Sequence, residues 1–166
     1  MYPPTGNLTT RRRFGEQGHR ICRGLPRPRD KIGDMHPKTE GILESSLYVD
    51  DVARSVQFYE KIFGFRVISD FGDRGRAMQA GTPQVLLLFT KNGSRSIQSP
   101  HHGDGELHIA FAIRAEELTV WEAWLAKNGI AVEEKRTWEL GGQSIYFRDP
   151  DRHLIEIATP GVWSIY

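Results

Sequence analysis

The sequence predicts an α+β fold in which two tandem βαβββ modules form a curved mixed sheet, a cup with its helices outside. Three observations support this prediction. Residues 41–67 and 105–132 share one pattern, a glycine followed by a short strand and an amphipathic helix. Each copy continues into a further strand and a hairpin. Each copy is also too small to bury a core alone, so we expect the two to pack against one another.

The first module begins with a strand in which Leu47 and Val49 alternate with polar residues. Asp50 or Asp51 is suited to cap the helix that follows, and Gly64 is suited to end it. The helix itself is indicated by apolar residues three or four positions apart, namely Val52, Val56, Tyr59 and Phe63. The strand FRVISDF and the hairpin AMQAGTPQVLLLF complete the module.

The second module repeats this order. Phe111 and Ile113 alternate in its first strand, and Gly129 is expected to end its helix. The apolar face of that helix consists of Leu118, Trp121 and Leu125. The strand IAVEEKRTW and the hairpin IYFRDPDRHLIEI follow. We interpret DPDR as a tight turn, in which Asp149 accepts from the backbone ahead and Pro150 fixes φ.

Three titratable side chains occupy strand centres where the pattern favours apolar ones. Glu156 alternates with Ile155 and Ile157, and Glu44 aligns with His108 in the first strands. An alignment of the hairpins without a gap places the apolar residues of one on the other, Ala77 on Ile145 and Leu86 on Leu154, and sets Leu88 opposite Glu156. An unpaired buried carboxylate costs several kcal/mol. Two carboxylates and an imidazole that meet inside a sheet therefore indicate a divalent cation.

Residues 41–166 resemble the vicinal oxygen chelate superfamily, which includes glyoxalase I, fosfomycin-resistance proteins, bleomycin-resistance proteins and extradiol dioxygenases. The resemblance rests on SLYVDDVARSVQFYEKIFGFRV, HIAF and YFRDPDRHLIEI, found in this order. It implies a metal in the cup, held by strand positions that match Glu44, His108 and Glu156. The first position is commonly His in the family and is Glu here. The fourth position, which the alignment assigns to Leu88, cannot ligate.

One neutral imidazole and two carboxylates favour hard or borderline ions, so the expected cofactor is one Mn²⁺, Fe²⁺, Ni²⁺, Mg²⁺ or Zn²⁺ per chain. The resemblance implies that Glu44 or Glu156 could also act as the base and that Tyr146 contacts the substrate. Ser46 faces the same side as Glu44 and could donate a hydrogen bond. Further candidates for substrate binding are a loop histidine and surface arginines, namely His102 (with His101 beside it), Arg76, Arg95 and Arg152. Two tryptophans could line the cup, Trp138 and Trp163.

The function expected first is a glyoxalase-like lyase or isomerase reaction on a small oxygenated substrate. Three alternatives remain open: thiol transfer of the fosfomycin-resistance type, ring cleavage by a dioxygenase, and metal-free ligand binding of the bleomycin-resistance type. Dioxygenases bind their metal with two His and one carboxylate, and Glu44 replaces one of the two His in this chain. Family resemblance and the aromatic residues of the helices predict a homodimer (Phe58, Tyr59, Trp121 and Trp124).

Composition also indicates the cellular compartment and the kinds of partner. The chain has 166 residues and a single cysteine, Cys22, so no internal disulfide is available and a reducing compartment, the cytoplasm, is expected. No apolar run approaches the ~18 residues of a membrane span. A membrane partner is therefore not expected, and neither is a nucleic-acid partner. The domain should comprise residues 38–166, with modules at about 41–92 and 105–160.

Residues 1–37 are basic, rich in Gly and Pro, and without apolar periodicity, so we predict a disordered extension. Three interpretations stay open: an arm for nucleic acid, a transit peptide, and a translation start placed too early, with Met35 as the true start. The last is favoured, because Met35 stands just before the first predicted strand.

Overall fold

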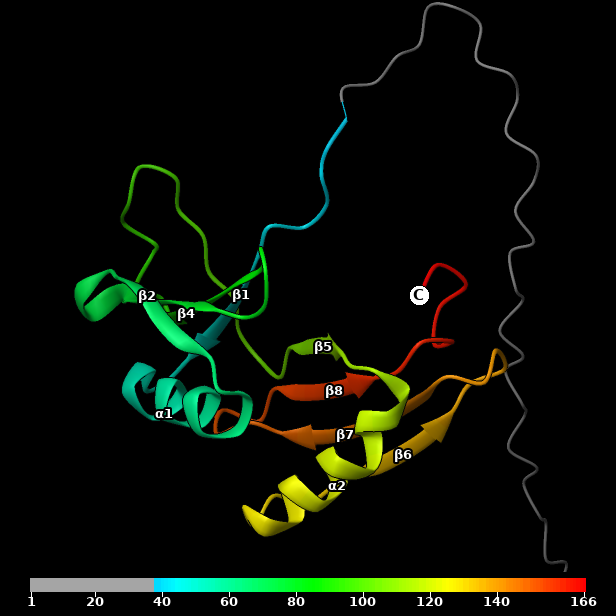
Figure 1. The fold of residues 1–166 in the computed structure, drawn as a ribbon. Coiled ribbons are helices and arrows are strands. Elements are labelled where there is room, and N and C mark those ends of the chain that lie inside the picture. Colours follow the sequence, from blue (N-terminus) through cyan, green and yellow to red (C-terminus); the bar gives the residue numbers. More distant parts are fainter. Residues whose placement is uncertain (1–37) are drawn as a thin grey trace, which may run out of the picture. The chain divides into compact units, whose positions relative to one another are not determined.

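The computed structural model describes residues 38–166, in which two modules of the same order follow one another (Figure 1). The first module holds a four-stranded sheet with the strand order β1-β4-β3-β2. Its β1–β4 pairing is parallel and its other pairings are antiparallel. We call this sheet A. Its elements are β1 (Glu44–Val49), α1 (Val52–Phe63), β2 (Arg66–Asp70), the short helix η1 (Gly72–Arg74), β3 (Gly75–Gln79) and β4 (Val85–Thr90).

The second module forms a second sheet, sheet B, with the equivalent strand order β5-β8-β7-β6 and the same mixture of pairings. Its elements are β5 (His108–Ala112), η2 (Ala115–Glu117), α2 (Leu118–Lys127), β6 (Glu134–Thr137), β7 (Gln143–Arg148) and β8 (Leu154–Ala158). The predicted α+β fold of two βαβββ modules is confirmed. Within one chain the strands are divided between two hydrogen-bonded sheets, and β1 and β5 are edge strands of these sheets.

The helix boundaries follow the predicted stop signals closely. Asp51 caps α1, and its carboxylate accepts the backbone N–H of Arg54 at 3.0 Å. Gly64 ends α1 with φ at 68°, a left-handed conformation that favours glycine. In the second module the helix ends one residue earlier than predicted, with Asn128 at its C-cap and Gly129 following at φ 73°.

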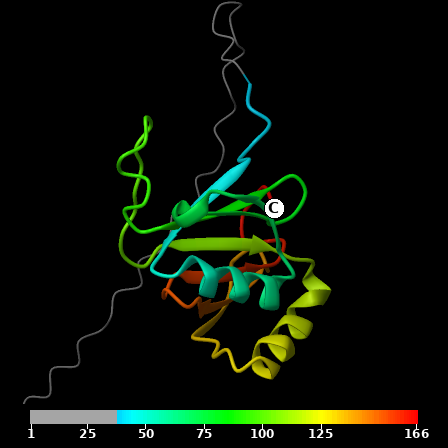
Figure 2. The same ribbon diagram turned by 90° about the vertical axis from the view of Figure 1, so that its left-hand side faces the viewer.

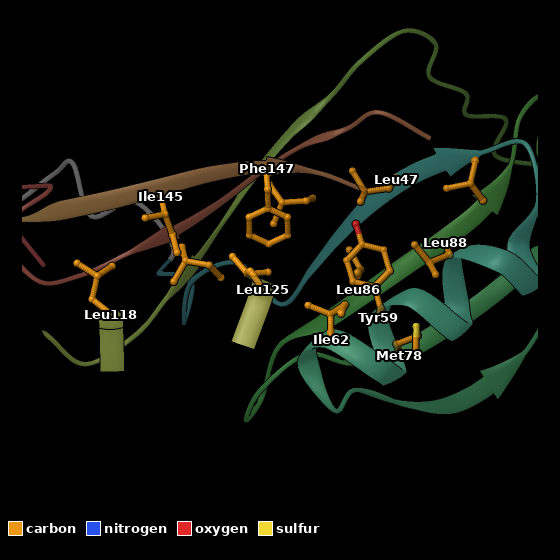
Figure 3. Close-up of a cluster of buried hydrophobic side chains, with 13 residues drawn as sticks. Leu47, Tyr59, Ile62, Met78, Leu86, Leu88, Leu118, Leu125, Ile145 and Phe147 are labelled. Atoms are coloured by element: carbon orange, nitrogen blue, oxygen red, sulfur yellow. The ribbon is translucent and has the colours of Figure 1, made fainter. Parts of the chain in front are cut away.

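One face of each sheet packs against the helices around a common core (Figure 3). Tyr59 and Phe147 are the largest side chains in it that are fully buried. Strand residues alternate between two faces, so the remaining strand positions form what we call the helix-free face of each sheet. On sheet A this face includes Glu44, Ser46, Tyr48, Ala77, Leu87 and Phe89, and on sheet B it includes His108, Ser144, Tyr146, Glu156 and Ala158.

The strand registers correct the predicted alignment of the two hairpins by one residue. Ala77 pairs with Leu87 in the first hairpin, and Tyr146 pairs with Glu156 in the second. Leu87 is therefore the counterpart of Glu156, whereas Leu88 is fully buried in the core. A shift of one residue exchanges the two faces of a strand. The position that the resemblance implies for a fourth ligand thus corresponds to Leu87, which is also unable to bind a metal.

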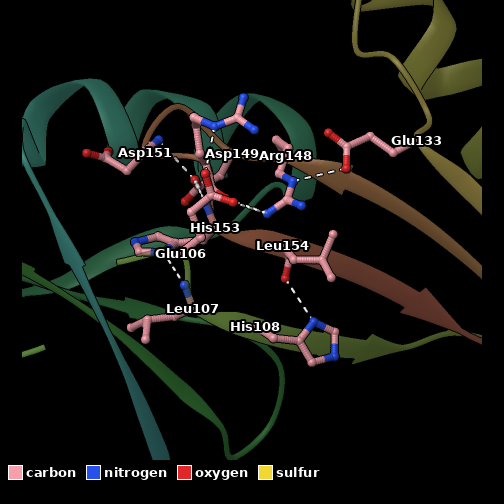
Figure 4. Close-up of polar contacts among 10 residues, drawn as sticks. Glu106, Leu107, His108, Glu133, Arg148, Asp149, Asp151, His153 and Leu154 are labelled. Carbon is pink, nitrogen blue, oxygen red and sulfur yellow. Dashed lines mark hydrogen bonds and ion pairs between the residues drawn. The ribbon is translucent and has the colours of Figure 1, made fainter. Parts of the chain in front are cut away.

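Polar side chains of the turn between β7 and β8 hold the two modules together through hydrogen bonds (Figure 4). Its first residue, Asp149, accepts the backbone N–H groups of Asp151 and His153, as the turn prediction requires. Asp149 also accepts the Tyr59 hydroxyl of α1 at 3.0 Å. Burial raises the pKa of the Asp149 carboxyl, and His153, these backbone donors and the Tyr59 hydroxyl oppose the rise.

Two further residues of this turn reach the first module. Asp151 accepts the backbone N–H of Asp50 and the hydroxyl of Ser55. The fully buried His153 lies between the modules, with Nδ1 accepting the N–H of Leu107 at 3.0 Å and Nε2 at 3.0 Å from the carbonyl of Tyr48. The predicted DPDR turn is confirmed, and the structure adds that it contacts the first module.

The predictions for residues 1–37 lie outside the described residues. None of the helices in 38–166 has the length and apolar character needed to cross a membrane. The aromatic residues that predicted a homodimer are used within the chain. Tyr59 is fully buried, and Trp124 donates its indole N–H to the carbonyl of Ile62 at 2.9 Å. A dimer therefore needs other support.

Candidate metal centre

His108 and Glu156 meet on the helix-free face of sheet B. The parallel register of β5 and β8 sets Ala110 opposite Glu156, so His108 is a diagonal neighbour of that carboxylate. His108 Nε2 lies 3.3 Å from Glu156 Oε2. On the other side of the ring, Nδ1 lies 3.1 Å from the carbonyl oxygen of Leu154 (Figure 4). A carbonyl only accepts, so Nδ1 carries the hydrogen of the neutral ring.

This tautomer directs the lone pair of His108 Nε2 toward a carboxylate oxygen. Two electron-pair donors in contact need a positive charge between them, which a proton or a metal cation can supply. Metal-binding histidines commonly donate their other ring N–H to a backbone carbonyl, as His108 does to Leu154. The pair therefore fits the imidazole and carboxylate part of a site for a divalent ion.

Glu156 is fixed by a hydrogen bond from Ser144, which is itself hydrogen-bonded to Trp138. The carboxylate is 6% exposed, and Ser144 on β7 donates its hydroxyl to Oε1 at 2.5 Å. Trp138 in turn donates its indole N–H to the Ser144 oxygen at 2.9 Å. One carboxylate oxygen of Glu156 is thus occupied, and the other faces His108.

Tyr146 completes this group. It pairs with Glu156 across β7 and β8, and its ring centroid lies 6.3 Å from that of His108. Burial, followed by the nearby Glu156 carboxylate, raises the pKa of the Tyr146 hydroxyl. The Tyr146 hydroxyl is therefore a hydrogen-bond donor that lies beside the Glu156 carboxylate.

Glu44 and Ser46 lie on the other sheet. Glu44 is exposed at the start of β1, on the same face as the half-buried Ser46. Within residues 38–166 no three His, Cys, Asp or Glu side chains gather closely enough to hold a metal ion. A single chain therefore brings together two of the three predicted ligands, His108 and Glu156, and leaves Glu44 apart.

The other predicted substrate-binding residues lie away from this pair. Arg76 forms an ion pair with Asp70 at 2.8 Å and, with α1 residues, lines a cleft on the side of sheet A that carries the helix. Arg152 is paired with Glu106 at 2.8 Å in the turn before β8. His102 is exposed in the loop that precedes β5. None of the three contacts the His108–Glu156 pair in this chain.

The structure shows a second polar pair, which the sequence patterns did not reveal. The Tyr48 hydroxyl lies 2.7 Å from His101 Nδ1, on the helix-free face of sheet A. The loop 91–107 that carries His101 lies on the side of this sheet opposite to α1 (Figures 1 and 2). Gly103 of the same loop lies against Tyr48, where an added Cβ would be 2.5 Å from the ring. Tyr48 and His101 are 53 residues apart, so no local pattern links them.

An apolar cleft of about 660 Å³ lies between the two edge strands. Ser45 of β1 and Ala110 of β5 line it, together with aromatic residues behind the strands, namely Phe63, Phe65, Phe111 and Trp121. The two edges that carry Glu44 and His108 are therefore separated by a cleft within one chain and are not joined by hydrogen bonds.

Three comparisons place this geometry among known proteins. Residues 41–157 match the family model of the glyoxalase/bleomycin resistance protein/dioxygenase superfamily. A metallothiol transferase FosB from Bacillus licheniformis is 33% identical over 127 residues, which cover 76% of this chain and 79% of that protein. Other FosB proteins from staphylococci match at similar identity.

Among solved structures, lactoylglutathione lyase from Agrobacterium tumefaciens superposes with a TM-score of 0.72 at 26% identity, covering 77% of this chain and 99% of that one. A mutant of the fosfomycin resistance protein FosX from Listeria monocytogenes, complexed with Mn(II) and 1S,2S-dihydroxypropylphosphonic acid, superposes with a TM-score of 0.56 at 25% identity, covering 72% and 90%. The family model spans most of the two modules described above. The chain therefore belongs to the glyoxalase/bleomycin resistance protein/dioxygenase superfamily.

Proposed function

We propose that the protein is a metal-dependent thiol transferase that adds a thiol to a small oxygenated electrophile such as an epoxide. The sequence alone put a lyase or isomerase reaction first. The metallothiol transferases among its relatives favour thiol transfer, which the sequence had left as an alternative. The single cysteine, Cys22, is consistent with a reducing compartment, and we propose the cytoplasm.

The observation that carries this proposal is the His108–Glu156 pair. His108 Nε2 and Glu156 Oε2 lie 3.3 Å apart, and each side chain is fixed by a hydrogen bond at its other polar atom. A preset imidazole and carboxylate suit Mn²⁺, Fe²⁺, Ni²⁺, Mg²⁺ or Zn²⁺. We propose one such ion per site.

A second copy of the chain could supply the third ligand. Edge strands present unpaired backbone groups that favour pairing with another strand. Here β1 carries Glu44 and β5 carries His108. Pairing β1 of one copy with β5 of another would join sheet A to sheet B of the partner and bring the two helix-free faces into one cup. The proposed homodimer thus places Glu44 of one copy near His108 and Glu156 of the other.

When bound, a divalent ion would act as a Lewis acid on the substrate oxygen. The chain's own residues would position the substrate. In the transfer step the thiolate sulfur bonds to an epoxide carbon as the carbon–oxygen bond breaks, and the freed oxygen gains the proton that the thiol lost. Tyr146 is suited to donate a hydrogen bond to this oxygen, because its side chain lies beside Glu156 and His108 on the helix-free face. Ser46 faces the same cup as Glu44.

The remaining predicted substrate contacts are Arg152, His102 and Arg76. Arg152 belongs to an ion network with Arg148 and Glu106 that lies near the His108 end of sheet B. Arg148 also pairs with Glu133, so the network holds two arginines and two glutamates, and an anionic substrate would have to displace a glutamate from an arginine. His102 and Arg76 would need a substrate that extends beyond the residues gathered around Glu156.

Product mass tests the reaction. The protein loaded with Mn²⁺ is incubated with fosfomycin and, in separate reactions, with cysteine, glutathione or bacillithiol, and the products are weighed by mass spectrometry. Thiol transfer yields the summed mass of both substrates. A gain of one water would show hydration instead, and thiol-dependent isomerisation of a hemithioacetal would return the lyase assignment to first place. His108→Ala should abolish the adduct, and Arg114→Ala, which changes a 79% exposed side chain beyond the end of β5, is the control.

Mixing two inactive variants tests whether sites are shared. Glu44→Ala and Glu156→Gln should each be inactive alone. In a mixed dimer one of the two sites would be whole, so an equal mixture that exchanges subunits freely should regain about a quarter of the wild-type activity. If each chain builds its own site, the mixture stays inactive, and the proposed arrangement is wrong.

A further inference from the structure

Trp138 is connected to the candidate metal centre by two hydrogen bonds in series. Its indole N–H donates to the Ser144 oxygen at 2.9 Å, and the Ser144 hydroxyl donates to Glu156 Oε1 at 2.5 Å. Ser144 is 1% exposed and Glu156 is 6% exposed, so water has little access to either bond. The loop between β6 and β7 thereby reaches a carboxylate on β8.

The polarity of this series is set by chemistry. An indole N–H can only donate, and an ionised carboxylate can only accept. Ser144 must therefore accept from Trp138 and direct its own proton to Glu156. Donors that act in series polarise one another, which strengthens the second bond. Oε1 is held in this way, and Oε2 is left facing His108 Nε2 at 3.3 Å.

The indole ring is itself held in place. The guanidinium carbon of Arg136 lies 5.0 Å from the Trp138 ring centroid. The Trp163 ring of the C-terminal segment stacks on it, with centroids 6.5 Å apart and an interplanar angle of 29°. Trp163 is 67% exposed and has no hydrogen bond to Ser144 or Glu156 among those found in residues 38–166. It supports the ring without belonging to the series.

We propose that Trp138 is a positioning residue of the metal centre, which acts through Ser144 to hold Glu156 with a single oxygen turned toward the ion. The inference rests on the proposed function, because it requires that Glu156 bind a metal. It assigns to Trp138 a task that differs from lining the cup as a wall.

Metal affinity provides the first test. Mn²⁺ dissociation constants are measured by calorimetry for the wild type and for four variants. Loss of a partner that orients a metal ligand weakens affinity by about 10- to 100-fold, and we expect this range for Ser144→Ala and its lower end for Trp138→Phe. Ser144→Thr keeps the hydroxyl and should restore affinity. Trp163→Phe is the control and should bind as the wild type does.

A double variant tests the order of the series. If Trp138 acts only through Ser144, then Trp138→Phe with Ser144→Ala should bind Mn²⁺ no more weakly than Ser144→Ala alone. Additive losses would mean that Trp138 acts by another route and would overturn the proposal. Thermal unfolding of the metal-free variants checks that each is folded.

The indole N–H resonance of Trp138 gives a readout that a merely structural role would not move. In ¹⁵N-labelled protein, the resonance lost in Trp138→Phe should shift on Mg²⁺ or Zn²⁺ addition to the wild type, and it should not shift in Ser144→Ala. If the wild type binds no divalent ion, the proposed function and the positioning role both fail. Tight binding with unchanged affinity in Trp138→Phe overturns the positioning role alone.

Discussion

Replacing Tyr59 by Phe would remove one oxygen atom from the junction of the two modules. The Tyr59 hydroxyl donates to Asp149 at 3.0 Å, and the two residues are 0% and 5% exposed. The ring of the variant would keep its stacking on Phe65, whose centroid lies 6.2 Å away. The change therefore isolates one buried hydrogen bond between α1 and the turn before β8.

The expected loss follows from the charge of the acceptor. A hydrogen bond to a charged group contributes about 1.5–3 kcal/mol, and burial prevents water from replacing the lost donor. We expect the free energy of unfolding to fall by about this amount at pH 7, which is a substantial part of the ~5–15 kcal/mol that stabilises a typical domain.

The loss should depend on pH in a defined direction. The pKa of Asp149 is raised in the folded protein, chiefly by burial, and the Tyr59 hydroxyl opposes that rise. The stability that protonation of Asp149 contributes is present below its unfolded pKa and is lost as pH rises through the folded one. Without the hydroxyl the folded pKa rises further. The deficit of Tyr59→Phe should therefore be larger at pH 7 than at pH 4.

Urea denaturation of both proteins at pH 4 and pH 7 measures this. Tyr166→Phe is the matched control, because the Tyr166 hydroxyl donates to the carbonyls of Ile113 and Ala158, which do not titrate. Its deficit should be the same at both pH values. A Tyr59→Phe deficit below about 0.5 kcal/mol at pH 7, or equal deficits at the two pH values, would refute the reasoning.

Three further predictions concern the centre, the core and the loop. Glu156→Gln should lose tight Mn²⁺ binding, because an amide is a weaker ligand than a carboxylate. The rise in melting temperature on adding Mn²⁺ should therefore disappear, and a rise as large as that of the wild type would contradict this. Phe147→Ala removes a fully buried ring and should lower the free energy of unfolding by about 3–5 kcal/mol in urea. Gly103→Ala should push the Tyr48 ring away from His101 and speed hydrogen exchange in the loop 91–107, whereas unchanged exchange would show that the loop tolerates a Cβ.

The fold was largely predictable because its helices and first strands show clear periodicity. Glu156 also stood out, since a carboxylate between Ile155 and Ile157 breaks an apolar pattern. The register of the first hairpin could not be read in the same way. Residues 85–89, VLLLF, are apolar at every position, so alternation does not show which of Leu87 and Leu88 faces the core.

The supporting contacts of the site could not be predicted for a different reason. Trp138 reaches Ser144, and His101 reaches Tyr48, through loops whose paths depend on tertiary packing. Loop conformation leaves no periodic trace in a sequence. The sequence therefore drew attention to Trp138 and His101 by residue type, but it did not predict their hydrogen-bond partners, Ser144 and Tyr48.

The edge positions of β1 and β5 also determine how the protein could polymerise. Pairing between two different edges is a head-to-tail contact, and such contacts either close into a ring or continue as an open filament. In a closed pair of chains both β1 edges and both β5 edges are used, so no third chain can join through this contact, while β2 and β6 remain as edge strands. A substitution that tilts one sheet slightly, at the module junction around Asp149 for example, would leave every local contact possible while preventing closure. Fibrous aggregates that grow with protein concentration, with intact secondary structure, would be the expected result of such a change.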